Sequence, residues 1–500
     1  MKKFKKILIA NRGEIAVRII RTCREMGLIP VAVYSEVDSQ ALHVRLAEEA
    51  YPLGEAAPAA SYLNIEKIIT IAKKCQAEAI HPGYGFLAEN HHFVRRCEEE
   101  GIIFIGPPSG PMELLGLKTI SRQKMKEAGV PIIPGTLEPI KNEKELIEQA
   151  EAIGFPLLLK ASAGGGGKGL RLVRQKEELL SAFRLAASEA QASFGDPSVY
   201  LEKYIDEPHH IEIQILVDNY GQAVYLGERE CSMQRRYQKI LEETPSPFID
   251  DNIRRRMGEI AVAAARSIGY RNAGTVEFIV DKNKNFYFLE VNARLQVEHP
   301  ITEMVTGIDL VRAQIEIAQG NPLPFTQEQI KPQGHAIECR IMAEDPFQNF
   351  LPSPGKILYL HRPGGPGIRD DSGIVEGYVV PIEYDALLSK LIAWGRTRDE
   401  AILRLRRALR EYQIYGIKTT IPFFLRILDH PDFLAGNYNT HFLERLEKEP
   451  LVATDEDLVA VIAAAVKAYH DLKKETSAVW PTKSHPWKLM GRIELLRSRL

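Results

Sequence analysis

The sequence has no apolar run that reaches the roughly 20 residues needed to cross a bilayer. Its first apolar run, residues 7–10, follows a basic start and is interrupted at once by Asn11, Arg12 and Glu14. Such a short run is typical of a first strand, whereas a signal peptide needs a longer apolar core. We therefore expect a protein that is neither exported nor inserted into a membrane.

An excess of charge of either sign is also missing, since 64 Lys and Arg nearly balance 66 Asp and Glu. No global field then draws nucleic acid or an anionic membrane to the chain, and any polyanion must be bound locally. The five cysteines are odd in number and include no C-x-x-C pair, which argues against a disulfide framework or a zinc site. We expect a reducing, cytoplasmic setting and no nucleic-acid partner.

The sequence does contain enough apolar material, 45% of 500 residues, for about two to four domains. A strand at 7–10, a helix at 13–26 and a strand at 30–34 open an α/β segment, with Gly27 at a helix C-cap position. Changes in pattern predict four parts: an α/β domain at 1–117, a domain at 118–333 with a subdomain at about 131–204, a mixed, β-rich domain at 334–446, and a helical extension at 447–500.

A glycine-rich loop occupies residues 163–169, Ala-Gly-Gly-Gly-Gly-Lys-Gly. It matches G-x-G-x-x-G, but that dinucleotide fingerprint needs a following helix, and residues 170–174 have the pattern of a strand. A Walker loop is excluded because Gly169, and neither Ser nor Thr, follows Lys168. The pattern predicts a hairpin lid whose backbone N–H groups cradle phosphates beside Lys160 and Lys168. A surface loop without a ligand remains the alternative.

Two strands, 274–280 and 286–292, are joined by a polar turn and should form an antiparallel hairpin. Centring the turn near Asn283 places Glu277 almost opposite Glu290, and cross-strand neighbours are about 5 Å apart. A cation between them would relieve the repulsion of two carboxylates. Together with the Asn292 oxygen, they form an oxygen-ligand set suited to Mg²⁺ bridging to phosphates.

Alternation along the second strand is expected to continue to Glu298. One face would then carry acids, amides and Arg294, and the other Val291, Ala293, Leu295 and Val297. A solvent-exposed strand face usually carries Lys, Thr and Ser, so this pattern favours the wall of an active site over the alternative of a solvent-exposed face.

Five ordered motifs resemble the biotin carboxylases of the ATP-grasp superfamily over about residues 1–446. They are Asn-Arg-Gly-Glu at 11–14, His-Pro-Gly-Tyr-Gly-Phe at 81–86, the glycine loop, Glu-Cys-Ser-Met-Gln-Arg-Arg at 230–236, and Arg-Leu-Gln-Val-Glu-His-Pro at 294–300. The resemblance implies an ATP-grasp fold with a Rossmann-like N-terminal domain. It also implies that ATP activates bicarbonate as carboxyphosphate, whose CO₂ is captured by biotin.

The resemblance also implies roles for individual residues. Nucleotide contacts map onto Lys118, Lys160, Gly166, Gly167, Glu202, Lys203, Tyr204, Ile205, His210, Gln234 and Tyr237. Metal ligands for Mg²⁺ or Mn²⁺ map onto Glu277, Glu290 and Asn292. Bicarbonate contacts map onto Lys239, Arg294, Gln296, the backbone of Val297, and Glu298. We assign Glu298 as the base, Arg294 as the group that stabilises the biotin enolate, and Lys239 as a third catalytic residue, with Arg340 and, more weakly, Tyr84 as biotin contacts.

Some positions need separate treatment. Tyr237 stands where relatives commonly have His, although its hydroxyl can still form a hydrogen bond. Of the two adjacent histidines only His210 aligns with a family ligand, and alternation places His209 on the apolar side of its strand. Without the resemblance, Arg340 would be assigned to a structural salt bridge.

The chain contains no Ala-Met-Lys-Met pattern for biotin attachment, so biotin is expected on a separate carrier protein. The resemblance implies a carboxyltransferase as a further partner and a homodimer as the assembly. Residues 486–492 resemble tails of subunits paired with pyruvate-type carboxyltransferases, and either a partner-binding segment or a packed terminal helix fits them.

Two other functions stay open at this point. Another ATP-grasp ligase, forming an amino-acid amide bond or carbamoyl phosphate, would share the glycine loop and the carboxylate hairpin. Residues 294–300 and Arg340 argue against it. A non-catalytic nucleotide-binding scaffold is disfavoured because Lys239, Glu277 and Glu298 are all present together with Glu290 and Arg294.

Overall fold

A computed structural model describes residues 4–161, 170–449, 459, 462–470, 490 and 494. The chain divides into two compact units, Met1–Glu444 and Arg445–Leu500, and every site residue discussed below belongs to the first. Among the described residues, no helix is long and apolar enough to cross a membrane.

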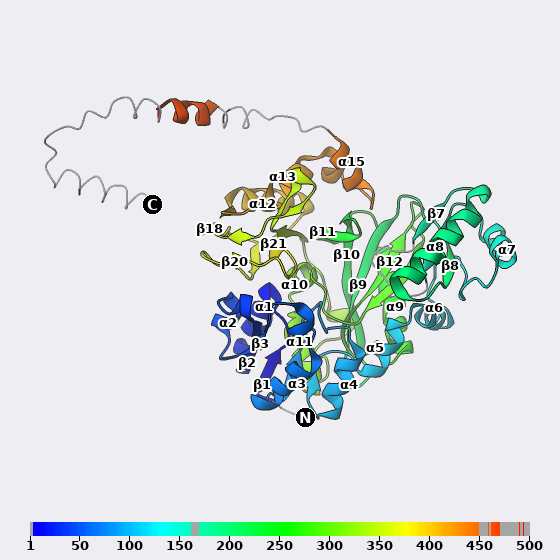
Figure 1. Cartoon of the computed structure of the whole chain (residues 1–500), viewed down its shortest axis with the longest axis horizontal. Coiled ribbons are helices and arrows are strands. Elements are labelled where there is room, and N and C mark those ends of the chain that lie inside the picture. Colours follow the sequence, from blue (N-terminus) through cyan, green and yellow to red (C-terminus); the bar gives the residue numbers. More distant parts are fainter. Residues whose placement is uncertain are drawn as a thin grey trace. The chain divides into compact units, whose positions relative to one another are not determined.

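The first unit begins with a parallel sheet in the order β3-β2-β1-β4-β5 (Figure 1). Ile7 and Ile9 pack with helix α1, while Leu8 faces the core beneath α3 and α4. Burial on both faces explains why successive residues of this strand are apolar. The expected order of strands and helices is confirmed, and Gly27 follows α1 with φ of 69°. The elements are β1 (Lys6–Ile9), α1 (Gly13–Glu25), β2 (Ile29–Ser35), α2 (Leu42–Leu46), β3 (Glu49–Gly54), α3 (Ile65–Lys74), β4 (Ala79–His81), α4 (His91–Glu99), β5 (Ile103–Phe104) and α5 (Ser109–Gly116).

An antiparallel sheet in the order β13-β12-β9-β10-β11-β14-β21-β19 forms the centre of the first unit (Figure 1). It crosses the boundary predicted near residue 333, because β11 pairs with β14. Its strands are β9 (His209–Val217), β10 (Ala223–Arg235), β11 (Gln238–Thr244), β12 (Asn272–Val280), β13 (Phe286–Asn292), β14 (His335–Met342), β19 (Ile368–Ser372) and β21 (Leu387–Gly395). Its helices are α9 (Asp251–Ser267), α10 (His299–Thr306), α11 (Leu310–Ala318) and α12 (Arg398–Glu411).

A smaller sheet, β7-β6-β8, lies within residues 131–204, the predicted subdomain. Its β6 (Leu157–Ala161) and β7 (Arg171–Val173) pair antiparallel, with Leu157 opposite Val173. A strand therefore follows the glycine loop, as predicted, and not the helix of a dinucleotide fold. The loop residues themselves lie outside the described part of the chain. The subdomain also contains α7 (Glu143–Ile153), α8 (Leu179–Phe194) and β8 (Val199–Lys203), and it is preceded by α6 (Lys118–Glu127).

The remaining elements of the C-terminal part are short. They are β15 (Glu344–Asp345) with β16 (Leu351–Pro352), β17 (Gly355–Lys356) with β20 (Val379–Val380), β18 (Tyr359–His361) with β22 (Gln413–Tyr415), and the helices α13 (Ile421–Asp429), α14 (Pro431–Leu434) and α15 (Phe442–Lys448).

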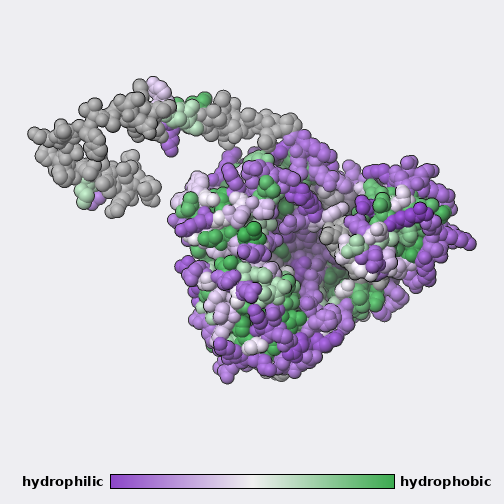
Figure 2. Space-filling model, in the orientation of Figure 1, coloured by the Kyte–Doolittle hydropathy of each residue, from purple (hydrophilic) through white to green (hydrophobic). Residues whose placement is uncertain are grey.

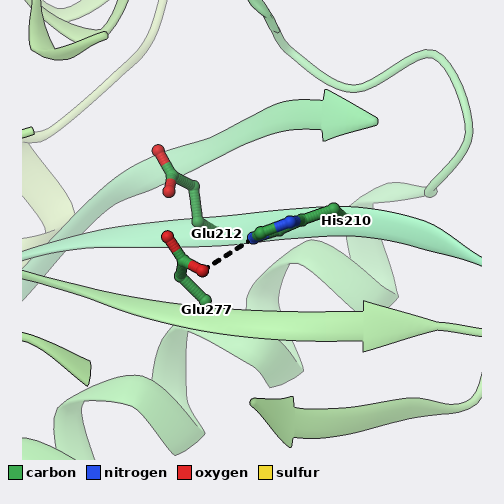
Figure 3. A group of neighbouring side chains, drawn as sticks. All are labelled: His210, Glu212 and Glu277. Atoms are coloured by element: carbon green, nitrogen blue, oxygen red, sulfur yellow. Dashed lines mark ion pairs between the residues drawn. The ribbon is translucent and has the colours of Figure 1, made fainter. Parts of the chain in front are cut away.

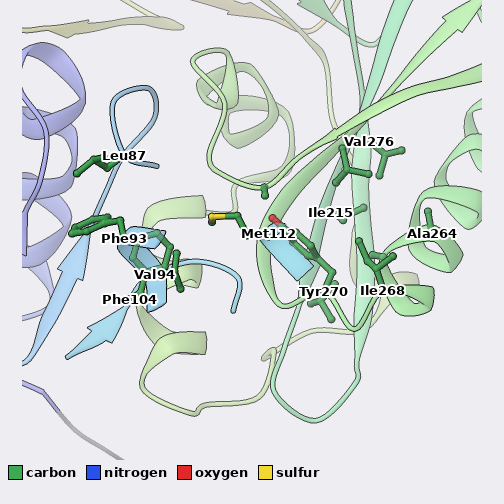
Figure 4. Close-up of a cluster of buried hydrophobic side chains, with 14 of the residues drawn as sticks. Leu87, Phe93, Val94, Phe104, Met112, Ile215, Ala264, Ile268, Tyr270 and Val276 are labelled. Carbon is green, nitrogen blue, oxygen red and sulfur yellow. The ribbon is translucent and has the colours of Figure 1, made fainter. Parts of the chain in front are cut away.

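One apolar core joins the N-terminal segment to the central sheet (Figure 4). Phe93 and Met112 of the N-terminal segment belong to the same buried cluster as Ile215 of β9 and Val276 of β12. Burying a side chain as large as Phe93 contributes about 2 kcal/mol relative to leaving it exposed. This shared core fixes β9 and β12, the strands that carry the carboxylates of the central sheet.

Candidate active site

The carboxylate hairpin has the predicted register, with Glu277 of β12 directly opposite Glu290 of β13. Its turn is closed by Asp281, whose carboxylate accepts hydrogen bonds from the backbone of Asn283 and Asn285. The two acids differ in environment, because Glu277 is 4% exposed and Glu290 is exposed. Asn292 donates its amide to Glu277 Oε1 at 2.9 Å, so the three predicted metal ligands lie on one short stretch of the sheet.

Lys239 of β11 lies at the centre of the acidic residues. Its Nζ donates to carboxylate oxygens of Glu277 at 2.8 Å and Glu298 at 2.8 Å. The third acceptor, Glu212 at 2.6 Å, has no exposed surface and was not predicted. Burial would lower the pKa of the Lys239 amine, yet the three carboxylates hold that pKa well above its ordinary value. Lys239 is therefore a permanent cation among three acids.

His210 and Glu212 lie two residues apart on β9, and the His210 ring points toward Glu277 (Figure 3). A ligand atom of Glu212 lies within 4.8 Å of those of His210 and Glu277. His210 Nε2 lies 2.8 Å from Glu277 Oε2, and its Nδ1 lies 2.6 Å from the amide of Gln234. Burial opposes ionisation of Glu277, but Lys239 and then His210 outweigh it and lower its pKa far below the ordinary value. Burial raises the pKa of Glu212.

His209 points away from this group. Its ring stacks on Phe248 with centroids 3.5 Å apart, which confirms the expectation that it lies on the apolar side of its strand.

The predicted continuation of the second strand to Glu298 is wrong. β13 ends at Asn292, and residues 293–298 leave the sheet as an irregular segment that reaches the start of α10. Pro300 in the first turn of α10 has no backbone N–H to lose, so a helix can begin there. Long-range contacts, and not alternation along a strand, orient Arg294 and Glu298.

Arg294 is held by two near neighbours in its own segment and by one distant residue, Glu89. Its Nε donates to Glu89 Oε2 at 2.9 Å, its Nη1 to Gln296 Oε1 at 2.9 Å and its Nη2 to Asn292 Oδ1 at 3.2 Å. Glu89, which follows the 81–86 motif, was not predicted. The amide nitrogen Nε2 of Gln296 is buried and has no hydrogen-bond partner among the described residues, so it is a donor available to an anion.

Glu298 forms ion pairs with both Lys239 and Arg340. Arg340 Nη2 lies 2.9 Å from Glu298 Oε2, and its Nε donates to Glu242 at 2.7 Å. Burial would raise the pKa of Glu298, but Lys239 and then Arg340 hold it well below its ordinary value. Burial raises the pKa of Glu242, the other carboxylate beside Arg340, to about 7. Arg340 is therefore more than a local structural salt bridge, because it contacts the predicted base.

The predicted nucleotide residues are only partly assembled. Lys160 forms an ion pair with Glu202, and Arg122 Nη1 also lies 2.5 Å from Glu202 Oε1. Lys203 turns its amine to the carbonyls of Gly154 and Phe155, both at 2.9 Å. Tyr204 and Ile205 are half-buried just after β8.

Tyr237, the other predicted contact beside Gln234, is exposed. It lies at the turn between β10 and β11 with φ of 66° and 70% exposure, and among the described contacts its hydroxyl forms none with the residues around Lys239. Gly166, Gly167 and the side chain of Lys118 lie outside the described part of the chain.

The donor chemistry fits a hard divalent cation. Glu277, Glu290 and Asn292 each carry a side-chain oxygen on the β12–β13 hairpin. Figure 2 shows a hydrophilic hollow in one face of the first unit. Carboxylate and amide oxygens of this kind suit Mg²⁺ or Mn²⁺. A sheet that presents paired carboxylates and cations beside a small glycine-loop subdomain defines an ATP-grasp enzyme.

Comparison with known proteins narrows this class. Three family models match: Biotin carboxylase, N-terminal domain, at residues 3–112; Carbamoyl-phosphate synthase L chain, ATP binding domain, at 118–326; and Biotin carboxylase C-terminal domain, at 338–445. Biotin carboxylase 1 of Bacillus subtilis is 54% identical over 88% of this chain and 98% of its own length. A pyruvate carboxylase subunit of Methanothermobacter thermautotrophicus is 50% identical over 93% of this chain and 99% of its own length.

Solved structures agree. The biotin carboxylase domain dimer of the Hydrogenobacter thermophilus 2-oxoglutarate carboxylase, in complex with MgADP, ADP and bicarbonate, has a TM-score of 0.85 at 49% identity, covering 90% of this chain and 100% of that one. Biotin carboxylase from Campylobacter jejuni has a TM-score of 0.85 at 48% identity, covering 89% and 99%. The chain therefore belongs to the biotin carboxylase family. It is an ATP-dependent ligase that carboxylates biotin.

Proposed function

We propose that the chain is the biotin carboxylase component of a multisubunit carboxylase and that it acts on biotin carried by a separate protein. The observation that carries the assignment of residues is the contact of Lys239 with Glu277 and Glu298, which joins the metal side of the site to the bicarbonate side. The carbamoyl-phosphate type of ligase is disfavoured, because family models specific to biotin carboxylase match on both sides of the shared ATP-binding domain.

Bicarbonate would be held by cations and amides near Glu298. Lys239 and Arg294 supply positive charge, and the buried amide nitrogen of Gln296 supplies a donor that no described residue uses. Glu298 is ionised at neutral pH, because its pKa lies well below the ordinary value, and it can accept the proton of bicarbonate. Transfer of the terminal phosphoryl group of ATP to a bicarbonate oxygen then gives carboxyphosphate and ADP.

Carboxyphosphate breaks into CO₂ and a phosphate trianion. That phosphate accepts the N1 proton of biotin, and N1 then attacks CO₂. In this proposal Arg294 stabilises the negative charge on the ureido oxygen of biotin, and Arg340 contacts the ring. A divalent cation bound by Glu277, Glu290 and Asn292 would neutralise the phosphate oxygens. Tyr84 remains a weaker biotin contact, since its hydroxyl donates to Glu14.

The test is turnover of ATP by the full chain with bicarbonate, with and without free biotin. We expect biotin to stimulate phosphate release, and Arg294→Ala or Glu298→Ala to abolish the stimulation. Arg95→Ala is the matched control, because it removes an arginine from an exposed ion pair with Glu113. Turnover that ignores biotin, or that survives both site substitutions, would refute the assignment.

We also propose two partners, a biotin carboxyl carrier protein and a carboxyltransferase, together with a homodimer as the assembly and a 2-oxo acid as the acceptor. The Methanothermobacter pyruvate carboxylase relative and the 2-oxoglutarate carboxylase small subunit of Hydrogenobacter thermophilus align over 93% and 94% of this chain and over 99% and 100% of their own length. Biotin carboxylase 1 aligns over only 88% of this chain, and the methylcrotonoyl-CoA carboxylase subunit alpha of Rattus norvegicus is aligned over only 66% of its own length. The complex purified from its source should carboxylate pyruvate or 2-oxoglutarate in preference to acetyl-CoA. A preference for acetyl-CoA would contradict the acceptor proposal alone.

A further inference from the structure

The segment that carries the proposed base is held by two cations on neighbouring strands. Arg340 of β14 and Lys390 of β21 stand directly opposite each other in the sheet. Arg340 contacts the carboxylate of Glu298, while Lys390 Nζ donates to the backbone carbonyl of Val297 at 2.9 Å. Adjacent strands therefore hold adjacent residues of the irregular segment, one by its side chain and one by its backbone.

Lys390 is itself fully buried and tied to the N-terminal sheet region. Its Nζ lies 3.1 Å from Glu14 Oε1, in the first turn of α1, and Tyr84 donates its hydroxyl to the same carboxylate. The Tyr84 ring lies 5.7 Å from Nζ, and Asp371 of β19 stands opposite Lys390 on the other side of β21. A buried amine surrounded in this way keeps a defined direction, because few other positions satisfy its charge.

The backbone around Glu14 is packed too closely to shift. A Cβ atom at Gly373, in the loop after β19, would lie 2.6 Å from the backbone nitrogen of Glu14. Only glycine allows this approach of the C-terminal part to α1. The distance from Glu14 to Lys390, and from Lys390 to Val297, is thus set by the packing of segments that are far apart in the sequence.

From this geometry we infer that Lys390, with Glu14 as its counter-ion, is a positioning residue that orients the Val297–Glu298 peptide for bicarbonate. The inference rests on the proposed function, since Val297 and Glu298 matter only if bicarbonate binds there. Lys390 touches neither bicarbonate nor biotin in this scheme. It acts by keeping the carbonyl of Val297 turned away from the site, so that the rest of the peptide and Glu298 face the anion.

The experiment compares Lys390→Met with the double variant Glu14→Gln/Lys390→Met in the full chain. The double variant also removes the Glu14 carboxylate that the missing amine would leave unpaired, while Asp371 keeps its hydrogen bonds from Arg369. It therefore provides a test if the single variant does not fold. Bicarbonate-dependent and ATP-dependent kinetics are measured together with the melting temperature. Arg398→Met is the matched control, because it breaks another buried ion pair in the same part of the chain, with Glu243, and has no contact with residues 293–298 among the described ones.

We expect both Lys390 variants to raise KM for bicarbonate at least tenfold, with KM for ATP changed less than twofold. Glu14→Gln alone should raise KM for bicarbonate less than threefold, because the amide oxygen can still accept from Lys390. Arg398→Met should lower the melting temperature and leave KM for bicarbonate unchanged.

A folded double variant whose KM for bicarbonate stays within twofold of the unaltered protein would overturn the inference. So would an Arg398→Met variant that raises this KM as much as Lys390→Met does, since general destabilisation would then explain both. Absence of bicarbonate-dependent ATP cleavage in the unaltered protein would instead refute the proposed function.

Discussion

The two glutamates of the carboxylate hairpin, Glu277 and Glu290, differ in burial and in their contacts. Glu277 is buried and already contacts Lys239, His210 and Asn292, so its charge is balanced within the protein. Glu290, directly opposite, is exposed toward solvent. Removing the charge of Glu277 would disturb the protein and the proposed metal site together. Glu290 is exposed, so solvent screens its charge within the protein and its removal should act mainly on the proposed metal site.

We therefore predict that Glu290→Gln raises the Mg²⁺ concentration for half-maximal ATP turnover by about tenfold or more, with little change in melting temperature. A neutral amide is a poorer ligand for a hard cation than a carboxylate. Turnover titrated with Mg²⁺ after removal of metal by a chelator is the measurement. Glu259→Gln, an exposed glutamate on α9, is the control, and an equal Mg²⁺ requirement in the two variants would argue against Glu290 as a ligand.

At the scale of elements, close helix packing supports the central sheet. Gly258 lies within α9, and a Cβ there would come within 2.6 Å of the ring of Tyr225 on β10. Gly110 in α5 has nothing within 4 Å of such an atom. Two helical glycines therefore differ in what an added methyl group would meet.

Gly258→Ala should lower the free energy of unfolding by about 1–3 kcal/mol, because the ring of Tyr225 must move to make room. Gly110→Ala should change it by less than about 0.5 kcal/mol, because the methyl group meets no obstacle and the following Pro111 offsets the helix preference of alanine. Urea denaturation of both variants is the measurement. The packing argument fails if the two changes lower the free energy of unfolding equally.

At the scale of the whole molecule, Glu243 joins elements far apart in the sequence. It has no exposed surface and accepts from Arg398 of α12 at 2.7 and 2.9 Å, from His335 of β14 and from Tyr438. Burial would raise its pKa, but His335 and Arg398 outweigh burial and lower it from 4.5 to about 2. A carboxylate whose pKa is lowered in the folded state stabilises the fold above its unfolded pKa.

Glu243→Gln should cost about 3 kcal/mol of stability at pH 7. The difference from the unaltered protein should shrink as pH falls from about 4.5 toward 2, where the carboxylate of the folded protein becomes protonated. Urea denaturation at pH 7, 5, 4 and 3 measures this difference in the free energy of unfolding, with Glu259→Gln as the exposed control. A difference that does not change with pH would contradict this role.

Local patterns predicted the features that depend on neighbours in sequence. The strand after the glycine loop and the Glu277–Glu290 register follow from short-range rules, because a five-residue turn fixes which residues of a hairpin face each other. Alternation also placed His209 on the apolar side of β9. The same rule failed beyond Asn292, because alternation says which face a residue occupies but not where a strand ends.

The sequence alone determined the family and the fold class, and it predicted the set of site residues, because motifs and hairpin registers are properties of short segments. Only the tertiary structure supplied Glu212, Glu89, Glu242 and Lys390 as partners of those residues. Their contacts join positions up to 205 residues apart, and a buried charge is stabilised by whichever charges the packing of distant segments brings beside it. No local sequence pattern predicts which distant residues become the partners of a buried charge.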